Sequence, residues 1–287
     1  MDVARSREKW HERLSRVINS TVCFSLAYVV ITYLFWLVMG FAGKLFKFDS
    51  FVRYYDIKYI LNDYDWSQLR ITFVYSSGPF FCLALGLFCL FLFNKLKAYR
   101  VIFNIFVLWG FIIGTSIFTS QAIIACLGAN KYLSPFYQNF AVVYAWWHVP
   151  VAVVYILAIP LLIAFLYFSV NYAKPFLITA HSYSKVNSEG RRKMYFIETA
   201  IVPFILGAVI TSAVTYPMNI RVHGVYMMMI AAALMIGWFS LVYIKIPKEE
   251  VLKYQTLQSP NPLFFFLLFL AISFVYIGWK GVNLHVK

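Results

Sequence analysis

The chain has 287 residues, of which 62% are hydrophobic and 13% are charged. A soluble domain is about 45–50% apolar and about 25% charged, so these proportions exclude a water-soluble fold. The formal net charge of +14 is spread between apolar runs instead of lying on one soluble face. We therefore expect no nucleic-acid partner, and we interpret the basic residues as topology signals and contacts with anionic lipid headgroups.

About seven apolar runs are long enough to cross a bilayer core of about 30 Å, which needs about 20 helical residues. The runs cover approximately residues 21–43, 71–94, 101–127, 141–170, 194–217, 224–244 and 263–279. The breaks between them are short, so the sequence predicts one integral membrane domain over residues 1–287, an all-α bundle of about seven transmembrane helices. The fourth run is long enough to tilt, or to kink at Pro150 and Pro160.

Two further segments have an amphipathic pattern. Residues 9–20 are basic and amphipathic, so we expect them to lie on the anionic cytoplasmic membrane surface. Residues 44–70 alternate aromatic and charged side chains. Because amphipathic rings favour headgroup depth, this pattern predicts an extracytoplasmic interfacial helix or a cap over the bundle.

The distribution of basic residues predicts the orientation. Segments 1–20, 95–100, 171–193 and 245–262 together contain 16 Lys and Arg residues, and the alternating segments contain 9. Cytoplasmic loops carry the excess of these residues. We therefore expect a cytoplasmic N-terminus, an extracytoplasmic C-terminus and a multi-pass location in the plasma (inner) membrane.

Signatures of familiar chemistry are missing from the sequence. It contains no His-Glu-x-x-His pattern, no phosphate-binding Walker loop, no Gly-x-Ser-x-Gly elbow and no dinucleotide fingerprint. The four cysteines all fall inside apolar runs, which favours small buried residues over a disulfide framework or a zinc site. We expect no metal and no cofactor, and whether the chain is an enzyme stays open.

Glu198 is the only charged residue inside a predicted helix. Charge within a bilayer is costly and is usually retained for function. One interpretation is a proton acceptor, a catalytic group or a cation ligand at the mouth of a cavity. The other is an interfacial carboxylate that pairs with the cluster Arg191, Arg192 and Lys193.

His148 lies about seven residues into the fourth predicted helix. It is interpreted either as a hydrogen-bonding residue between helices or as part of a polar substrate site. The predicted orientation places His148, His223 and His285 on one side of the membrane, with methionines near His223, so copper or haem ligation is a further interpretation. Their spacing matches no defined metal signature.

Small and polar residues mark the third and fifth predicted helices. Gly110 and Gly114 form a GxxxG pattern and share a helical stripe with Gln121, while Gly207 lies in the fifth helix. Such glycines allow close helix packing. The alternative is a polar lining of a substrate cavity, with Gln121 as its most discriminating member.

The basic loop 171–193 contains His181, Arg191 and Arg192. These side chains are suited to a phosphate or a lipid headgroup, with His181 as an acid or base, although any cytoplasmic loop is rich in basic residues.

Two functional hypotheses follow from these patterns. The first is a non-enzymatic component, which is either a transporter-like bundle or a subunit that associates with a partner membrane protein. The second is a membrane-embedded enzyme that acts on a lipid or isoprenoid at the cytoplasmic interface through His181 or Glu198. An uncharged bundle core and the missing catalytic signatures favour the first.

Overall fold

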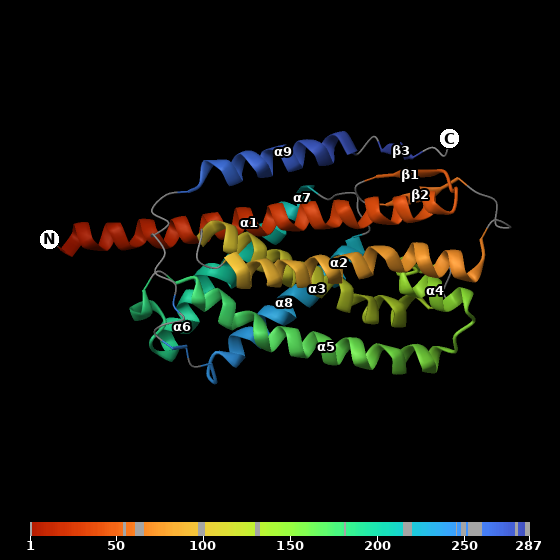
Figure 1. The fold of residues 1–287 in the computed structure, drawn as a ribbon. Helices are drawn as coiled ribbons and strands as arrows, with labels where there is room; N and C mark the ends of the chain where they lie inside the picture. Colours follow the sequence, from red (N-terminus) through yellow and green to blue (C-terminus); the bar gives the residue numbers. More distant parts are fainter. Residues whose placement is uncertain are drawn as a thin grey trace.

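The protein is a bundle of long helices that lie roughly side by side in this computed structural model (Figure 1). The structure describes residues 2–53, 56–60, 66–96, 101–129, 133–180, 182–214, 220–244, 246–247, 251, 260–278 and 281–284. The helices are α1 (Asp2–Leu45), α2 (Gln68–Leu96), α3 (Val101–Gly128), α4 (Phe140–Trp146), α5 (Val151–Ile178), α6 (Glu189–Phe196), α7 (Val202–Val214), α8 (Ile220–Ser240) and α9 (Pro262–Gly278).

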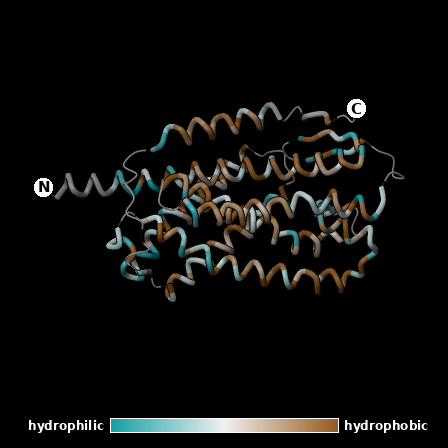
Figure 2. Tube along the Cα trace, viewed as in Figure 1, coloured by the Kyte–Doolittle hydropathy of each residue, from teal (hydrophilic) through white to brown (hydrophobic). Residues whose placement is uncertain are grey.

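Six helical segments of the described chain are long and apolar enough to cross a membrane. They are Trp10–Leu45, Gln68–Lys95, Val101–Gly128, Val151–Ile178, Glu189–Val214 and Ile220–Ser240. Figure 2 shows apolar residues along the lengths of the helices and hydrophilic residues mainly toward the two ends of the bundle. The prediction of a helical membrane bundle is therefore confirmed, with six such segments in place of the expected seven.

The remaining apolar helix, α9, has 17 residues and lies beside α1 (Figure 1). The backbone N–H of Asn261, just before α9, donates to Oδ1 of Asn19 at 2.8 Å. Beyond the other end of α9, Leu284 lies against Gly40, where an added Cβ would come 3.0 Å from its Cδ1. The described residues 261–278 and 281–284 thus lie along α1 from Asn19 to Gly40.

The innermost helix is α3, most of whose side chains are buried. It packs closely on α2 because glycines meet at the contact: a Cβ added to Gly114 would lie 2.5 Å from the carbonyl oxygen of Cys82 and 3.0 Å from the backbone of Gly86. A Cβ added to Gly110 would meet only the Cys89 side chain. Backbone atoms cannot rotate away as a side chain can, so the approach at Gly114 requires glycine.

Three short strands form a small sheet beside the C-terminal end of α1. They are β1 (Ser50–Val52), β2 (Ile57–Tyr59) and β3 (Val282–Leu284), in the order β2-β1-β3, with both pairs antiparallel. Phe51 is opposite Lys58 on one side and Asn283 on the other. Of the segment 44–70, the described residues between the end of α1 and the start of α2 therefore form a strand-built cap and not the interfacial helix that was one of the two expectations.

Aromatic packing attaches this cap to the bundle. The hydroxyl of Tyr59 donates to the carbonyl oxygen of Met39 at 2.9 Å. The ring of Trp66 packs edge-on against Phe48 and Tyr59, with centroid distances of 4.7 and 5.3 Å. Burial, with a smaller contribution from the neighbouring Tyr75, raises the pKa of Tyr59 well above its usual range, so its hydroxyl stays neutral and continues to donate.

The predicted fourth helix, 141–170, is wrong as a single element. The structure has the short helix α4, a turn over 147–150, and then α5, which continues to Ile178. Pro150 disfavours helical backbone at the residue before it, Val149. His148 has a positive φ of 51° and lies in the turn, not within a helix, and its side chain is exposed.

The predicted surface segment 9–20 is part of α1, and its second half does not lie on a membrane surface. Arg16 is only 5% exposed, and Asn19 and Ser20 are fully buried. The fifth predicted helix begins earlier than expected: α6 continues through a π-helical turn, η3 (Ile197–Ile201), into α7. The basic loop is correspondingly shorter than 171–193, because α5 ends at Ile178 and α6 begins at Glu189.

The contact at Gly114 gives a stability prediction. We expect Gly114→Ala to cost about 1–3 kcal/mol, because the new methyl group meets the α2 backbone. The matched control is Gly224→Ala in α8, where an added Cβ meets nothing within 4 Å, and which should be neutral or stabilise the helix by up to about 1 kcal/mol. Thermal unfolding in detergent measures both, and a Gly114→Ala variant as stable as Gly224→Ala would contradict the packing argument.

Candidate functional site

Glu198 lies at the centre of an ion-pair cluster at the end of the bundle where α1 enters. Its carboxylate is 3.4 Å from Nε of Arg13 and 3.3 Å from Nη1 of Arg16. Glu12 is 3.5 Å from Arg16 and 3.8 Å from the ammonium of Lys185. In the described chain, the ion-pair partners of Glu198 thus come from α1, and the expected pairing with residues 191–193 is replaced.

Arg16 is the buried member of this cluster. Its guanidinium has carboxylates from Glu12 and Glu198 within salt-bridge distance and lies 5.0 Å from the ring centroid of Tyr195. A buried charge is tolerated only when partners replace its hydration. The aromatic face supplies a further favourable electrostatic contact. The side chain of Arg16 is therefore held in one position, where α1 meets Tyr195 of α6 and Glu198.

A cavity of about 400 Å³ opens beside this cluster. We call it the cationic pocket; it is lined by Arg13, Arg16, Ser184, Lys185, Arg191, Met194, Tyr195 and Glu198. Four of these side chains are cationic and one is a carboxylate. Even with the adjacent Glu12 included, positive charge remains in excess, so the pocket is suited to an anionic group.

Local hydrogen bonds bring the loop residues to the cationic pocket. The 3₁₀ turn η2 (Tyr183–Lys185) is stabilised by Oγ of Ser182, which accepts from the backbone N–H of Ser184 at 3.3 Å. Nη1 of Arg191 donates to the carbonyl oxygen of Ser184 at 2.7 Å. These contacts connect the turn at residues 182–185 to α6, and both Lys185 and Arg191 line the pocket.

The π-helical turn η3 carries Glu198, which also lines the cationic pocket. A π turn inserts an extra residue into the helix and rotates the following side chains, and such turns are frequent at functional sites. The turn is fixed to α1 because Oγ of Ser20 donates to the carbonyl oxygen of Thr199 at 2.5 Å. The same hydroxyl accepts from Nε1 of Trp109 in α3 at 2.9 Å.

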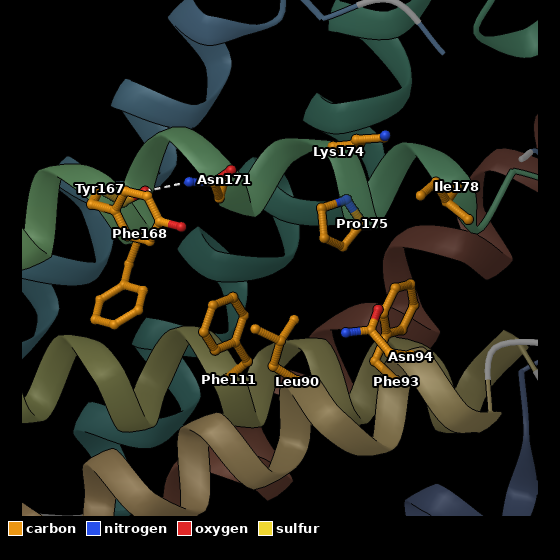
Figure 3. A pocket seen from close by; sticks show the side chains of 10 residues that line it. All are labelled: Leu90, Phe93, Asn94, Phe111, Tyr167, Phe168, Asn171, Lys174, Pro175 and Ile178. Atoms are coloured by element: carbon orange, nitrogen blue, oxygen red, sulfur yellow. Dashed lines mark hydrogen bonds between the residues drawn. The ribbon is translucent and has the colours of Figure 1, made fainter. Parts of the chain in front are cut away.

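A second cavity, of about 440 Å³, lies between α5 and the pair α2 and α3 (Figure 3). Its walls are mostly apolar, with Asn94, Asn171 and Lys174 as the polar exceptions. In Figure 3 the side chains of Phe111, Leu90 and Phe168 lie in the space between the helices. The Asn171 amide donates to the carbonyl oxygen of Tyr167 at 2.7 Å. The shape and chemistry of this cavity suit an apolar chain more than a soluble ligand.

A polar contact between helices lies deeper in the bundle, at His223 of α8. Its Nδ1 is 2.7 Å from the hydroxyl of Tyr28 in α1, and its Nε2 is 3.1 Å from Oγ of Ser212 in α7. Both ring nitrogens are therefore engaged. Among the described residues no group of three or more His, Cys, Asp or Glu side chains is arranged for a metal, and His285 and Met218 lie outside the described residues.

The residues singled out from the sequence do not form one site. Glu198 and Arg191 line the cationic pocket, whereas Arg192 does not. Gln121 is fully buried in α3, and His181 lies outside the described residues. Gly207 lies against the ring of Phe24.

Sequence reasoning missed the contribution of α1 to the site. Arg16 lies three residues after Arg13 and four after Glu12, so it shares a helical face with both. An amphipathic face of this kind can pack on lipid headgroups or on another helix, and the spacing of its residues does not tell which. The signal for another helix was Glu198, whose negative charge complements Arg13 and Arg16.

Comparisons with known protein families, with curated proteins and with solved structures found no match.

The cluster around Glu198 gives a second stability prediction. We expect Glu198→Gln to cost about 1–3 kcal/mol, because Arg16 stays buried with only Glu12 as a carboxylate partner. Glu189→Gln is the matched control, since Glu189 forms its ion pair with Lys193 at an exposed position, and such pairs contribute about 0–1 kcal/mol. Equal melting temperatures for the two variants would show that the buried pair does not anchor α1.

Proposed function

We propose that this helical membrane protein is a non-enzymatic component that recognises an anionic, phosphate-bearing group in the cationic pocket, either as a transporter-like bundle or as a subunit of a membrane complex. The observation that carries the proposal is the excess of cationic side chains around one cavity, with the buried Arg16 among them. Guanidinium groups match phosphate oxygens in charge and in bidentate geometry.

The orientation of the chain is part of this proposal. We place the cationic pocket and the start of α1 in the cytoplasm, and the β1–β3 sheet on the outer side of the plasma (inner) membrane. The support is the excess of basic residues at the pocket end. Anionic headgroups at the cytoplasmic face and a partner membrane protein are the proposed partners, and nucleic acid is not among them.

The alternative is an enzyme acting on a lipid or isoprenoid at the same interface. The apolar cavity of Figure 3 is the observation that favours it, because its walls could hold the chain of such a substrate. The described residues of the cationic pocket include ion-paired Glu198 but no histidine to act with it as an acid–base pair. We therefore favour the non-enzymatic function.

Ligand-dependent stabilisation tests the cationic pocket. We expect phosphatidylglycerol or inorganic phosphate to raise the melting temperature of the detergent-purified protein above that in chloride of equal ionic strength. A ligand at about 100 times its Kd adds about 2.7 kcal/mol. The double variant Lys185→Gln/Arg191→Gln should lose most of this shift.

The matched control is Lys95→Gln, which removes a cationic side chain of α2 that stacks on Phe91 and does not line the cationic pocket. It should keep the full shift. A shift with phosphatidylglycerol alone identifies a lipid headgroup, and a shift with both probes identifies phosphate itself. If neither probe stabilises the wild-type protein, or if Lys95→Gln loses as much as the double variant, the proposal fails.

A substitution at His181 separates the two functions. We expect His181→Ala to leave the lipid profile of the producing cells unchanged, because the proposed binding role requires no acid–base group there. Mass spectrometry of extracted lipids, with cells lacking the protein as the reference, is the measurement. Accumulation of one lipid species in both the deletion strain and the His181→Ala strain would instead support the enzyme.

A further inference from the structure

The cavity between α5 and the pair α2 and α3 is open to the outside of the bundle. Its lining residues Asn94, Tyr167 and Asn171 are exposed, whereas Phe93 and Phe111, which also line it, are each 2% exposed. All three helices belong to the segments that are long and apolar enough to cross a membrane. In a bilayer, the space of about 440 Å³ is therefore reached from the lipid.

The apolar and polar parts of the lining lie toward different ends of this cavity. Figure 3 shows Phe111 and Phe168 toward one end and Asn94 toward the other, on the side of Ile178. The rings of Phe111 and Phe168 pack edge-on with their centroids 6.1 Å apart. Asn94 lies two residues before the end of α2, and Ile178 is the last residue of α5. The cavity is thus aromatic toward the middle of the helices and polar where α2 and α5 end.

The polar side chains that face the space are neutral. Asn94 and Asn171 are amides, and Nδ2 of Asn171 already donates to the carbonyl oxygen of Tyr167 at 2.7 Å. In Figure 3 the ammonium of Lys174 lies on the side of α5 away from Phe111. The amide of Asn94 can donate to an uncharged acceptor. A ligand of this cavity therefore needs a neutral hydrogen-bond acceptor and no negative charge.

The surroundings and the length of the cavity indicate what fills it. A void among apolar side chains loses dispersion contacts, and an apolar cavity offers water too few hydrogen bonds. From Tyr167 to Ile178 the lining covers about 16 Å of helix. The hydrocarbon core of a bilayer is about 30 Å thick, so one leaflet of acyl chains covers about half of that. A single acyl chain therefore matches the cavity in length and in apolar character.

We propose that this cavity is a binding site for one acyl chain of a bilayer glycerolipid. The chain lies against Phe111 and Phe168, and the ester carbonyl oxygen at its head accepts a hydrogen bond from the amide of Asn94. The site recognises the chain and its ester and not the headgroup charge, which distinguishes it from the cationic pocket. The proposal depends neither on the ligand of that pocket nor on any reaction of the lipid. Because α5 is the least buried of the six candidate spans, the bound chain supplies packing that α5 otherwise lacks.

Photolabelling from a bilayer tests the site. The full chain is reconstituted in phosphatidylcholine that contains a small fraction of phosphatidylcholine with a diazirine in one acyl chain, and mass spectrometry identifies the labelled residues. We expect labelling to concentrate on Leu90, Phe111 and Phe168, and to be equal when phosphatidylglycerol replaces phosphatidylcholine as carrier and probe. Labelling spread evenly over the exposed positions of every helix, or labelling that requires phosphatidylglycerol, would overturn the proposal.

Two variants separate the chain from its ester. Leu90→Trp fills the cavity and should lower labelling there about tenfold. Asn94→Leu changes an exposed side chain and should lower it about threefold, because the ester loses one hydrogen bond. The matched control is Ile156→Trp, at an exposed position of α5 outside the cavity, which should label as the wild type does. Melting temperatures establish that each variant is folded, and unchanged labelling in both folded cavity variants would contradict the site.

Discussion

The arrangement of the helices around α1 depends on polar contacts made by two side chains that α1 buries, Arg16 and Ser20. Apolar helices gain little by leaving lipid for one another, so specific contacts between them must come from close packing and hydrogen bonds. Ser20 supplies such a contact, because its one hydroxyl links α1 to η3 through Thr199 and to α3 through Trp109. One turn earlier, Arg16 is paired with Glu198 of the same π turn. These two residues fix the position of η3 and so place Glu198 beside the cationic pocket.

The same face of α1 continues deeper into the bundle with residues four positions apart. Phe24 follows Ser20, and its ring packs edge-on against Trp109 and Phe204 with centroid distances of 4.9 and 5.6 Å. Tyr28 follows Phe24 and pairs with His223 at 2.7 Å. Along this face, the aromatic layer around Phe24 thus lies between the polar contacts of Ser20 and those of Tyr28. Gly207 allows that layer to close, because an added Cβ would overlap the ring of Phe24.

Much of the helical architecture was predictable. A segment that crosses lipid must form its own backbone hydrogen bonds as a helix, and its side chains must be apolar over a long run. The ends of α3 at Val101 and Gly128 agree closely with the predicted 101–127. The sheet was not predictable, because each strand has three residues and Phe51 pairs with Asn283 from the other end of the chain. Such short strands have no usable period. The break before α5 was indicated only by Pro150, which was equally compatible with a kink.

The cationic pocket was less predictable than the helices, for a physical reason. At the cationic pocket, the sequence contained the charges but not their pairing, and Glu198 had nearer basic residues in the chain than Arg16. A hydrophobic pattern thus locates the helices, whereas the π turn η3 and the side chains that α1 buries against it determine where charged and polar groups meet between them.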